Sequence, residues 1–249
     1  MKSYKDVLLQ LKTLKLRGVE INLDSIITEA ETTKQSYLGF LQQLLKNELD
    51  NRSERRYRRN ITAAHFPVVK EIQGFNFNRV KGITKTQISQ LLDFSWIDKK
   101  ENVLFFGPPG LGKTHLAIAI GYEAISKGYT VCFERITNLI KILKNSDIQR
   151  TAGFRLRKIL KSHVLIIDEI GYTPIDKREA NLFFILISEM YEKQSIILTS
   201  NKSFTVWAEM LGDEIMTTAL LDRLLHHARI FSLEGESYRI EKLKEVNTI

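Results

Sequence analysis

The stretch NVLFFGPPGLGKTHLAIAI, residues 102–120, decides the fold of this chain. An apolar run, residues 102–106, leads into the loop GPPGLGKT, residues 107–114, and apolar residues at helical spacing follow it. The loop fits the pattern G-x-x-x-x-G-K-[ST], and this pattern requires a strand before it and a helix after it. The sequence therefore predicts a phosphate loop for a nucleoside triphosphate, carried by an α/β fold.

Each residue type in this loop has a chemical reason. Glycine lets the backbone curl so that several N–H groups point at phosphate oxygens, and the positive end of the next helix adds to the attraction. Pro108 and Pro109 stiffen the loop, Lys113 is a catalytic candidate that contacts the β- and γ-phosphates, and the Thr114 hydroxyl coordinates Mg²⁺. We expect ATP and Mg²⁺ as cofactors, with nucleotide contacts from Gly107, Pro108, Pro109, Gly110, Leu111, Gly112, Lys113, Thr114 and His115.

Further apolar runs alternate with helical segments along the rest of the chain. They are TVCFE (130–134), HVLIID (163–168), SIILTS (195–200) and RIFSL (229–233). Short apolar runs separated by helices are typical of a parallel sheet that is covered by helices on both faces. The sequence therefore predicts an α/β sheet from about residue 100 onward.

Polar residues follow two of these runs and complete a catalytic hypothesis. Asp168 ends a buried strand, so it can reach Mg²⁺ from the strand's carboxyl end. Glu169 can orient and polarise the attacking water, and Asn201 can hold that water or the γ-phosphate if its strand lies between the other two. The alternatives are that the acidic pair caps the next turn and that Asn201 is an ordinary residue of a turn.

The chain is predicted to have three parts. Residues 1–65 form a helical domain for DNA or partner binding, in which Gly18 breaks the first helix. Residues 66–100 form a linker with one short helix, capped by Thr84 or Thr86. Residues 101–249 form the nucleotide-binding core.

Composition narrows the class of protein. Basic residues number 37 against 29 acidic ones, so the net charge is +8, which favours polyanionic partners, although simple solubility is the alternative. Cys132 is the only cysteine, so no internal disulfide forms, and we expect a cytoplasmic location. No apolar run reaches the length of a membrane span, and the N-terminus lacks the features of a signal peptide.

Two basic segments are candidates for DNA binding. Arg52, Arg55, Arg56 and Arg59 share one helical face, which can contact phosphates, a partner protein or only solvent. The second segment lies between the second and third apolar runs and contributes Lys141, Lys144, Arg150, Arg155, Arg157 and Lys158. Its alternative is an ordinary amphipathic helix with a basic solvent face. Neither segment indicates base readout, so we expect little sequence specificity.

Five segments together carry a family resemblance. GPPGLGKTHLA, VLIIDEIGY, ILTSN, TTALLDRLLHHARIF and GESYR resemble the IstB-type transposition helper ATPases of the AAA+ superfamily, in the clade of DnaC-like helicase loaders and replication initiators. The resemblance implies a P-loop fold with a five-stranded parallel sheet and a central phosphate-loop strand. It also implies ATP-dependent homo-oligomers, as rings or helical assemblies, on double-stranded DNA and a partner transposase.

Other residues gain roles only through the resemblance. Arg223 matches the arginine finger that reaches the ATP of a neighbouring subunit, and Arg239 resembles a second sensor that contacts nucleotide. Only 16 residues follow Leu233, so the core has a truncated C-terminal lid. Phe75 and Phe77 occupy the stretch that flanks adenine in similar ATPases, with aromatic packing as the alternative.

Three further interpretations stay open. A helicase loader shares the whole core and differs in its N-terminal module and partner. A metabolic phosphotransferase is disfavoured by the paired Asp168 and Glu169 and by the absence of an arginine-rich acceptor lid. The pair His226–His227 lacks the spacing and the carboxylate partner of a zinc site, so we expect it to have a packing or capping role.

Overall fold

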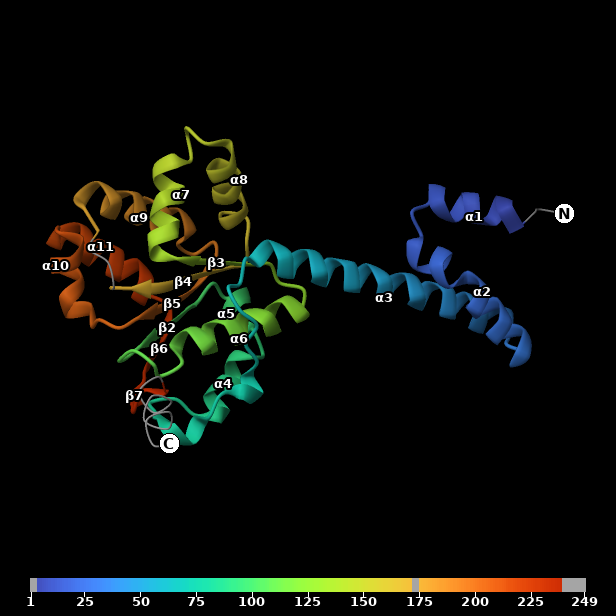
Figure 1. Ribbon diagram of the computed structural model, residues 1–249, viewed down its shortest axis with the longest axis horizontal. Coiled ribbons are helices and arrows are strands. Elements are labelled where there is room, and N and C mark those ends of the chain that lie inside the picture. Colours follow the sequence, from blue (N-terminus) through green and yellow to red (C-terminus); the bar gives the residue numbers. More distant parts are fainter. Residues whose placement is uncertain (1–3, 172–174, 239–249) are drawn as a thin grey trace, which may run out of the picture. The chain divides into compact units, whose positions relative to one another are not determined.

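The computed structural model describes residues 4–171 and 175–238. The chain divides into two compact units, Met1–Arg59 and Asn60–Ile249. Figure 1 shows helices alone in the first unit and a sheet with surrounding helices in the second. The three-part division drawn from the sequence stays a prediction.

Three helices build the N-terminal unit. They are α1 (Tyr4–Thr13), α2 (Arg17–Thr32) and most of α3 (Tyr37–Ala64), whose last residues belong to the second unit. Val19, Leu23 and Ile26 of α2 are buried, because they recur at helical spacing on one face. The all-helical N-terminal region predicted from the sequence is confirmed.

Gly18 lies inside α2, so the expectation that it breaks the first helix is wrong. A Cβ atom at Gly18 would lie 2.6 Å from the carbonyl oxygen of Asn47 and 2.9 Å from the Cα atom of Glu48. Glu48 Oε2 also accepts a hydrogen bond from the Gly18 N–H at 2.7 Å. The missing side chain therefore permits close contact between α2 and α3, with a carboxylate at the positive end of α2.

A five-stranded parallel sheet forms the centre of the second unit. Its strands are β2 (Asn102–Phe106), β3 (Val131–Arg135), β4 (Val164–Ile170), β5 (Ser195–Ser200) and β6 (Ala228–Ser232), in the spatial order β3-β4-β5-β2-β6. The predicted sheet is confirmed. The phosphate-loop strand β2 is interior, but β5 holds the middle position, so the expectation of a central phosphate-loop strand needs correction.

Helices cover both faces of this sheet. On one face, α6 (Lys113–Ser126), α4 (Lys85–Leu91) and α5 (Ser95–Asp98) pack in a first hydrophobic core with β2 and β4 residues such as Phe105 and Ile166. On the other face, α7 (Ile136–Asn145), α9 (Lys177–Met190), α10 (Trp207–Leu211) and α11 (Glu214–Leu225) build a second core. Strands buried on both faces explain the almost continuous apolar runs in the sequence.

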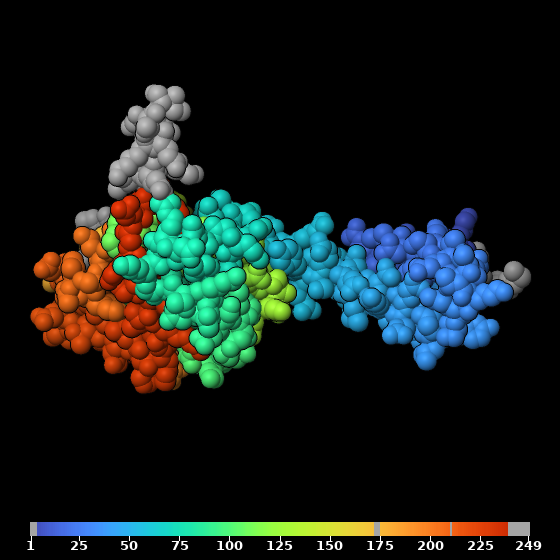
Figure 2. All heavy atoms as spheres, turned by 90° about the horizontal axis from the view of Figure 1, so that it is seen from below, coloured from blue at the N-terminus to red at the C-terminus, as the bar shows by residue number. Residues whose placement is uncertain are grey.

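Shorter elements complete the second unit. The helix α8 (Arg150–Ile159) packs beside α7, and the 3₁₀ turns are η1 (Ile72–Gly74), η2 (Phe77–Arg79) and η3 (Phe204–Val206). Thr84 caps α4 in a reciprocal capping box with Gln87, which confirms the predicted cap. The strand β1 (Val80–Lys81) pairs with β7 (Glu234–Gly235), and Figure 2 shows the teal segment that contains β1 beside the red C-terminal segment.

None of the helices within residues 4–171 and 175–238 is long and apolar enough to cross a membrane.

Candidate functional site

A cavity of about 510 Å³ opens at the carboxyl ends of β2, β4 and β5. Parallel sheets bind ligands in this crevice because their strands end there and the helix N-termini point into it. The walls include the phosphate loop, the first turn of α6 and the segment 68–76. Several predicted site residues line it together: Pro109, Gly110, Gly112, Lys113, Thr114, His115, Glu169 and Asn201.

The glycines of the phosphate loop are required by the backbone and by their neighbours. Gly107, Gly110 and Gly112 have φ angles of 136°, 84° and 83°, which L side chains rarely adopt. A Cβ atom at Gly107 would lie 2.2 Å from the carbonyl oxygen of Leu233, and one at Gly110 would lie 2.0 Å from Ser237 Oγ. The loop is therefore shaped partly by the C-terminal segment, a constraint that the loop sequence alone does not contain.

Lys113 begins α6 and is buried, with 7% of its surface exposed. Its Nζ atom donates hydrogen bonds to the carbonyl oxygens of Gly107 and Pro108, at 2.6 and 2.7 Å. These bonds hold the ammonium group inside the curl of the loop, where the open N–H groups of the first turn of α6 also point. The arrangement gathers positive charge where a triphosphate would lie.

Asp168 is fully buried behind the cavity wall residues Thr114 and Thr199 and has an unused oxygen. Its Oδ1 accepts hydrogen bonds from the hydroxyls of Thr114 at 2.7 Å and Thr199 at 2.6 Å. Its Oδ2 has no hydrogen-bond partner among the described residues. A buried carboxylate oxygen left unpaired beside a threonine hydroxyl fits Mg²⁺, which prefers hard oxygen ligands. Thr114 and Asp168 are therefore the residues that would hold the ion.

Glu169 and Asn201 meet at the same end of the sheet. The strand β5 lies between β4 and β2, as the hypothesis for Asn201 required. Glu169 has a φ angle of 65°, its Oε2 lies 3.4 Å from Nε of Arg135, and the residue lines the cavity. The Oδ1 atom of Asn201 is buried without a hydrogen-bond partner in the described part of the chain, so the amide has an acceptor free for a ligand or water.

Sequence reasoning missed several wall residues. Thr199 bonds Asp168 although only the neighbouring Asn201 was singled out, and Tyr238 joins the wall from the C-terminal segment. The Tyr238 N–H donates to the carbonyl oxygen of Gly110 at 3.1 Å. Phe75 lines the cavity and contacts the His115 ring, whereas Phe77 packs against Phe75. The run LTSN gave a signal for Thr199, because a polar residue inside a buried strand needs a partner.

Arg223 lies away from this cavity. It sits on α11, donates a hydrogen bond to the carbonyl oxygen of Ala219 at 2.8 Å and stacks over the Phe184 ring of α9 at 5.0 Å. Arg239, the expected second sensor, lies outside the described residues. The site that the structure assembles from one chain therefore does not include Arg223.

The basic segments divide into exposed and buried residues. The α3 arginines are all exposed, and Arg52 pairs with Glu48 at 2.6 Å. In the second segment Lys141, Lys144, Arg150 and Arg157 are exposed, and Lys158 is half-buried. Two of these residues have partners: Lys144 pairs with Glu179 at 2.9 Å, and Lys158 lies over the Phe154 ring at 4.8 Å.

Arg155 is not a surface residue, so its assignment to DNA binding is wrong. Only 7% of it is exposed, and its Nε lies 2.5 Å from Glu134 Oε1. Its other nitrogens donate to the carbonyl oxygens of Ala63 and Ala64 at 2.7 and 3.3 Å, and of Phe133 at 3.1 Å. The guanidinium therefore ties the end of α3 to β3, because buried charges need ion pairs and hydrogen bonds.

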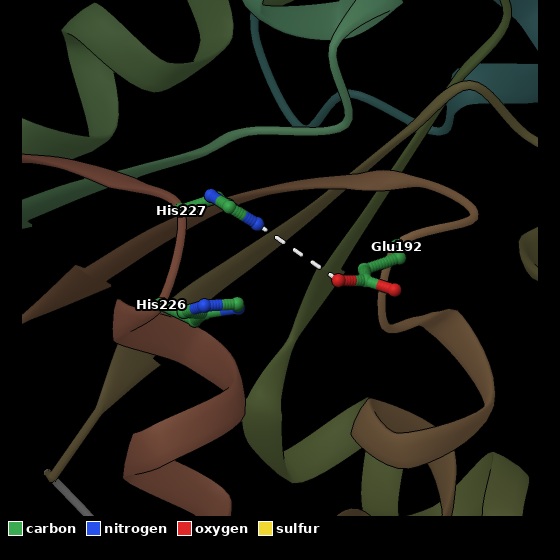
Figure 3. Close-up of side chains that lie close together, drawn as sticks. All are labelled: Glu192, His226 and His227. Carbon is green, nitrogen blue, oxygen red and sulfur yellow. Dashed lines mark ion pairs between the residues drawn. The ribbon is translucent and has the colours of Figure 1, made fainter.

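A separate polar cluster lies where α9 and α11 end (Figure 3). His227 Nε2 lies 3.8 Å from Glu192 Oε1, so the expectation that the histidine pair lacks a carboxylate partner is wrong. His226 is the C-cap residue of α11 and its Nδ1 is 2.6 Å from the Tyr191 hydroxyl, in agreement with a packing and capping role. All three side chains of the cluster are exposed, and we assign it no ligand.

Comparisons with known proteins identify the family of this chain. The sequence profile of the family described as IstB-like ATP binding protein matches residues 9–246. An "insertion sequence IS21 putative ATP-binding protein" from Pseudomonas aeruginosa is 38% identical over 239 residues, which cover 96% of this chain and 90% of the relative. An "insertion sequence IS5376 putative ATP-binding protein" from Geobacillus stearothermophilus is 45% identical over 213 residues, with coverage of 86% and 85%.

Solved structures agree on the fold. The crystal structure of DnaI matches with a TM-score of 0.57 and 19% identity, over 66% of this chain and 91% of that chain. At this identity the likeness shows the fold alone. The family profile, by contrast, matches residues 9–246, nearly the whole chain. The chain is therefore an ATPase of the AAA+ fold and belongs to the IstB-like ATP binding protein family.

Proposed function

We propose that this ATPase assembles with further copies of itself on double-stranded DNA and that the ATP-bound assembly recruits and stimulates a transposase. The relatives named as insertion sequence ATP-binding proteins support a role in transposition. In this proposal, ATP joins neighbouring subunits, and its hydrolysis releases them.

The position of Arg223 carries the proposal. Phosphoryl transfer needs positive charge near the γ-phosphate in the transition state, and an arginine from a neighbour commonly supplies it. Among the described residues no arginine lines the cavity, where the basic wall residues are Lys70 and Lys113. Arg223 lies partly exposed on α11, where it can enter the cavity of a second copy. A site completed by a neighbour couples hydrolysis to assembly.

The chain's own residues supply the remaining steps. The phosphate loop and Lys113 bind the triphosphate, and Thr114 with Asp168 holds Mg²⁺, which neutralises phosphate charge when bound. Glu169 orients the attacking water and accepts its proton, while Asn201 fixes the position of that water or of the γ-phosphate.

Two exposed basic surfaces supply the DNA contacts. The α3 surface consists of Arg52, Arg55, Arg56 and Arg59, and the α7–α8 surface consists of the exposed Lys141, Lys144, Arg150 and Arg157 with the half-buried Lys158. Lysine and arginine side chains that contact phosphates give affinity that falls steeply with salt and depends little on base sequence.

The first test measures ATP turnover with duplex DNA, with single-stranded DNA and without DNA, at two protein concentrations. We expect turnover per subunit to rise with duplex DNA and with protein concentration, because the arginine comes from a neighbour. A metabolic phosphotransferase would not respond to DNA, and a helicase loader would respond to single strands. A monomer that ignores duplex DNA at every Mg-ATP concentration would contradict the proposal.

A mixing experiment tests the neighbour's arginine. Arg223→Ala should bind ATP but lose about 10³- to 10⁵-fold in turnover. Adding subunits that carry Glu169→Gln, which have an intact Arg223 and an inactive site, should restore turnover in the Arg223→Ala subunits. No recovery in a mixture that still assembles would place the action of Arg223 within its own chain.

Charge reversal tests the α3 surface. Arg55→Glu with Arg56→Glu should weaken duplex binding and reduce the slope of log affinity against log salt by about 0.9 for each lost phosphate contact. Lys99→Glu with Lys127→Glu is the matched control, since these exposed lysines lie outside both basic surfaces. Loss of transposase binding with unchanged DNA affinity would identify the α3 surface as a docking site for the partner.

A further inference from the structure

One hydroxyl group connects the two acidic residues of the site. Thr199 Oγ1 donates a hydrogen bond to Asp168 Oδ1 at 2.6 Å and accepts one from the Glu169 N–H at 3.0 Å. The residue is 2% exposed, so these bonds are shielded from water. A hydroxyl group has one proton and two lone pairs. Here the proton is donated to the Asp168 carboxylate, and a lone pair of the oxygen accepts the Glu169 N–H.

The backbone explains why a side chain makes this contact. Ile167 pairs with Leu198 and Ile170 pairs with Ser200, so the register between β4 and β5 shifts between these pairs. Two residues of β4, Asp168 and Glu169, therefore lie opposite the single residue Thr199. An irregularity of this kind breaks the ladder and redirects side chains. The Glu169 N–H, which the ladder would otherwise bond, is bonded by the Thr199 hydroxyl instead.

The same hydroxyl determines which oxygen of Asp168 stays free. Oδ1 accepts both threonine hydroxyls, from Thr114 and Thr199, and Oδ2 has no partner among the described residues. Rotation of the carboxylate would break both bonds. Thr199 thus helps to keep Oδ2 as the oxygen available to a cation or to its bound water.

Glu169 depends on the contact as well. Its φ angle of 65° lies in the left-handed region, which residues other than glycine seldom occupy without support. The bond from its N–H to Thr199 holds the backbone of a residue that lines the cavity. Removal of the hydroxyl would let this residue relax and turn its side chain away.

We propose that Thr199 is a positioning residue for ATP hydrolysis, which sets the Asp168 carboxylate for Mg²⁺ and the Glu169 side chain for water through one hydroxyl group. The inference rests on the roles proposed above for Asp168 and Glu169. Thr199 acts through these two residues and not by contact with the reacting atoms.

The test compares Thr199→Val, which keeps the shape and removes the hydroxyl, with Thr199→Ser, which keeps the hydroxyl. The full-length variants are assayed for turnover against Mg²⁺ concentration and for binding of a fluorescent ATP analogue with Mg²⁺ and with EDTA. Thr199→Val should lower kcat and raise the Mg²⁺ concentration for half-maximal turnover, each by about 10- to 100-fold, as is typical when a partner of a metal ligand is lost. Analogue binding in EDTA should stay within about twofold, and Thr199→Ser should restore both quantities.

Ser195→Ala is the matched control, because Ser195 is also a buried hydroxyl of β5 but bonds the Trp96 carbonyl at the other end of the strand. It should leave the Mg²⁺ dependence unchanged. If Thr199→Val does not fold in a thermal melt, Thr199→Ala takes its place.

Three results would overturn the proposal. The first is that turnover of Thr199→Val depends on Mg²⁺ concentration as turnover of the unmodified protein does. The second is that Thr199→Val loses analogue binding equally with and without Mg²⁺. The third is that Thr199→Ser is as impaired as Thr199→Val. If the unmodified protein hydrolyses no ATP with any DNA, the proposed function fails. The Mg²⁺ effect on analogue binding then still tests Thr199.

Discussion

The two units of this chain bury their apolar side chains to very different extents. Among the described residues of the N-terminal unit the buried hydrophobic ones are Val19, Leu23 and Ile26, whereas the second unit has a hydrophobic core on each face of its sheet. Eleven of the eighteen exposed large hydrophobic side chains of the described residues belong to the N-terminal unit, including Leu38, Leu41, Leu45 and Leu49 on α3.

The functional features of the two units differ in the same way, since they are buried in the second unit and exposed in the N-terminal unit. In the second unit the chemistry depends on buried contacts, since Lys113, Asp168 and Thr199 are all held by hydrogen bonds inside the core. In the N-terminal unit the prominent features are exposed, namely an apolar stripe and a row of arginines on α3. Changes to these buried residues of the second unit should therefore alter catalysis or folding, and changes on α3 should alter association with other molecules.

Among the variants that compare the two units, the largest effect is expected for Glu169 in the second unit. Glu169→Gln keeps the shape of the side chain but removes the base, so turnover should fall by about 100- to 10,000-fold. Binding of ATP should persist, because Glu169 holds water and not phosphate in the proposed mechanism, and assemblies on DNA should last longer. Single-turnover hydrolysis and analogue binding measure the two effects. Normal turnover would remove Glu169 from the mechanism.

A buried arginine in the second unit should matter more for stability than the exposed ones. Arg155→Met leaves Glu134 buried without its partner, so the free energy of unfolding should fall by about 3–5 kcal/mol in denaturant titrations. Arg157→Met is the matched control on the same helix and should change it by less than about 0.5 kcal/mol. If Arg155→Met weakens DNA binding at an unchanged free energy of unfolding, the prediction that Arg155 binds DNA would be supported after all.

Glu48 links α2 to α3 and should make the N-terminal unit sensitive to acid. Burial alone would raise the pKa of Glu48, but hydrogen bonds from Arg52 and from the N–H groups of Gly18 and Val19 outweigh it and lower the pKa below its usual 4.5. A lowered pKa stabilises the folded unit above pH 4.5, and this stabilisation is lost as the pH falls through the folded value.

Hydrogen exchange of the α2 amides between pH 3 and pH 7 measures this effect in the full chain. Protection should decrease below about pH 4.5, after correction for the intrinsic exchange rate. Glu48→Gln should lower protection at pH 7 by about 0.5–2 kcal/mol, as for a lost helix cap, and should flatten the pH dependence. An unchanged pH dependence in Glu48→Gln would show that another group is responsible.

The smallest effect is expected on the α3 stripe. Leu41 is 50% exposed, so Leu41→Ser should change the free energy of unfolding of the purified protein by less than about 0.5 kcal/mol. The buried counterpart Leu23→Ala should cost about 2–5 kcal/mol. Thermal melts measure both. A large loss of stability in Leu41→Ser would mean that the stripe is already covered in the purified protein.

Much of the nucleotide site could be predicted because its signals are local. The phosphate loop, the strand that ends at Asp168 and the strand that precedes Asn201 each appear as an apolar run joined to polar residues. The predicted cap at Thr84 was equally local and is confirmed. Patterns of this kind depend on backbone geometry within a few residues, so one sequence is enough to find them.

The wrong predictions for Arg155 and Gly18 have one physical cause, which is contact between residues far apart in the chain. Arg155 looked like other basic residues of a helix until the fold placed Glu134 and the end of α3 around it. Gly18 looked like a helix breaker until α3 packed against it. The sequence does not specify which distant residues will surround a given residue. Those neighbours decide whether a charged side chain is buried in an ion pair and whether a glycine permits close helix packing.

The sequence by itself determined that this chain binds a nucleoside triphosphate on a parallel sheet, because loop and strand patterns follow from local sterics and burial. The tertiary structure decided the pairing of β4 with β5, the shift that sets Asp168 and Glu169 opposite Thr199, and the distance of Arg223 from its own cavity. These features arise from strand order and packing between distant segments, which only the folded chain brings together.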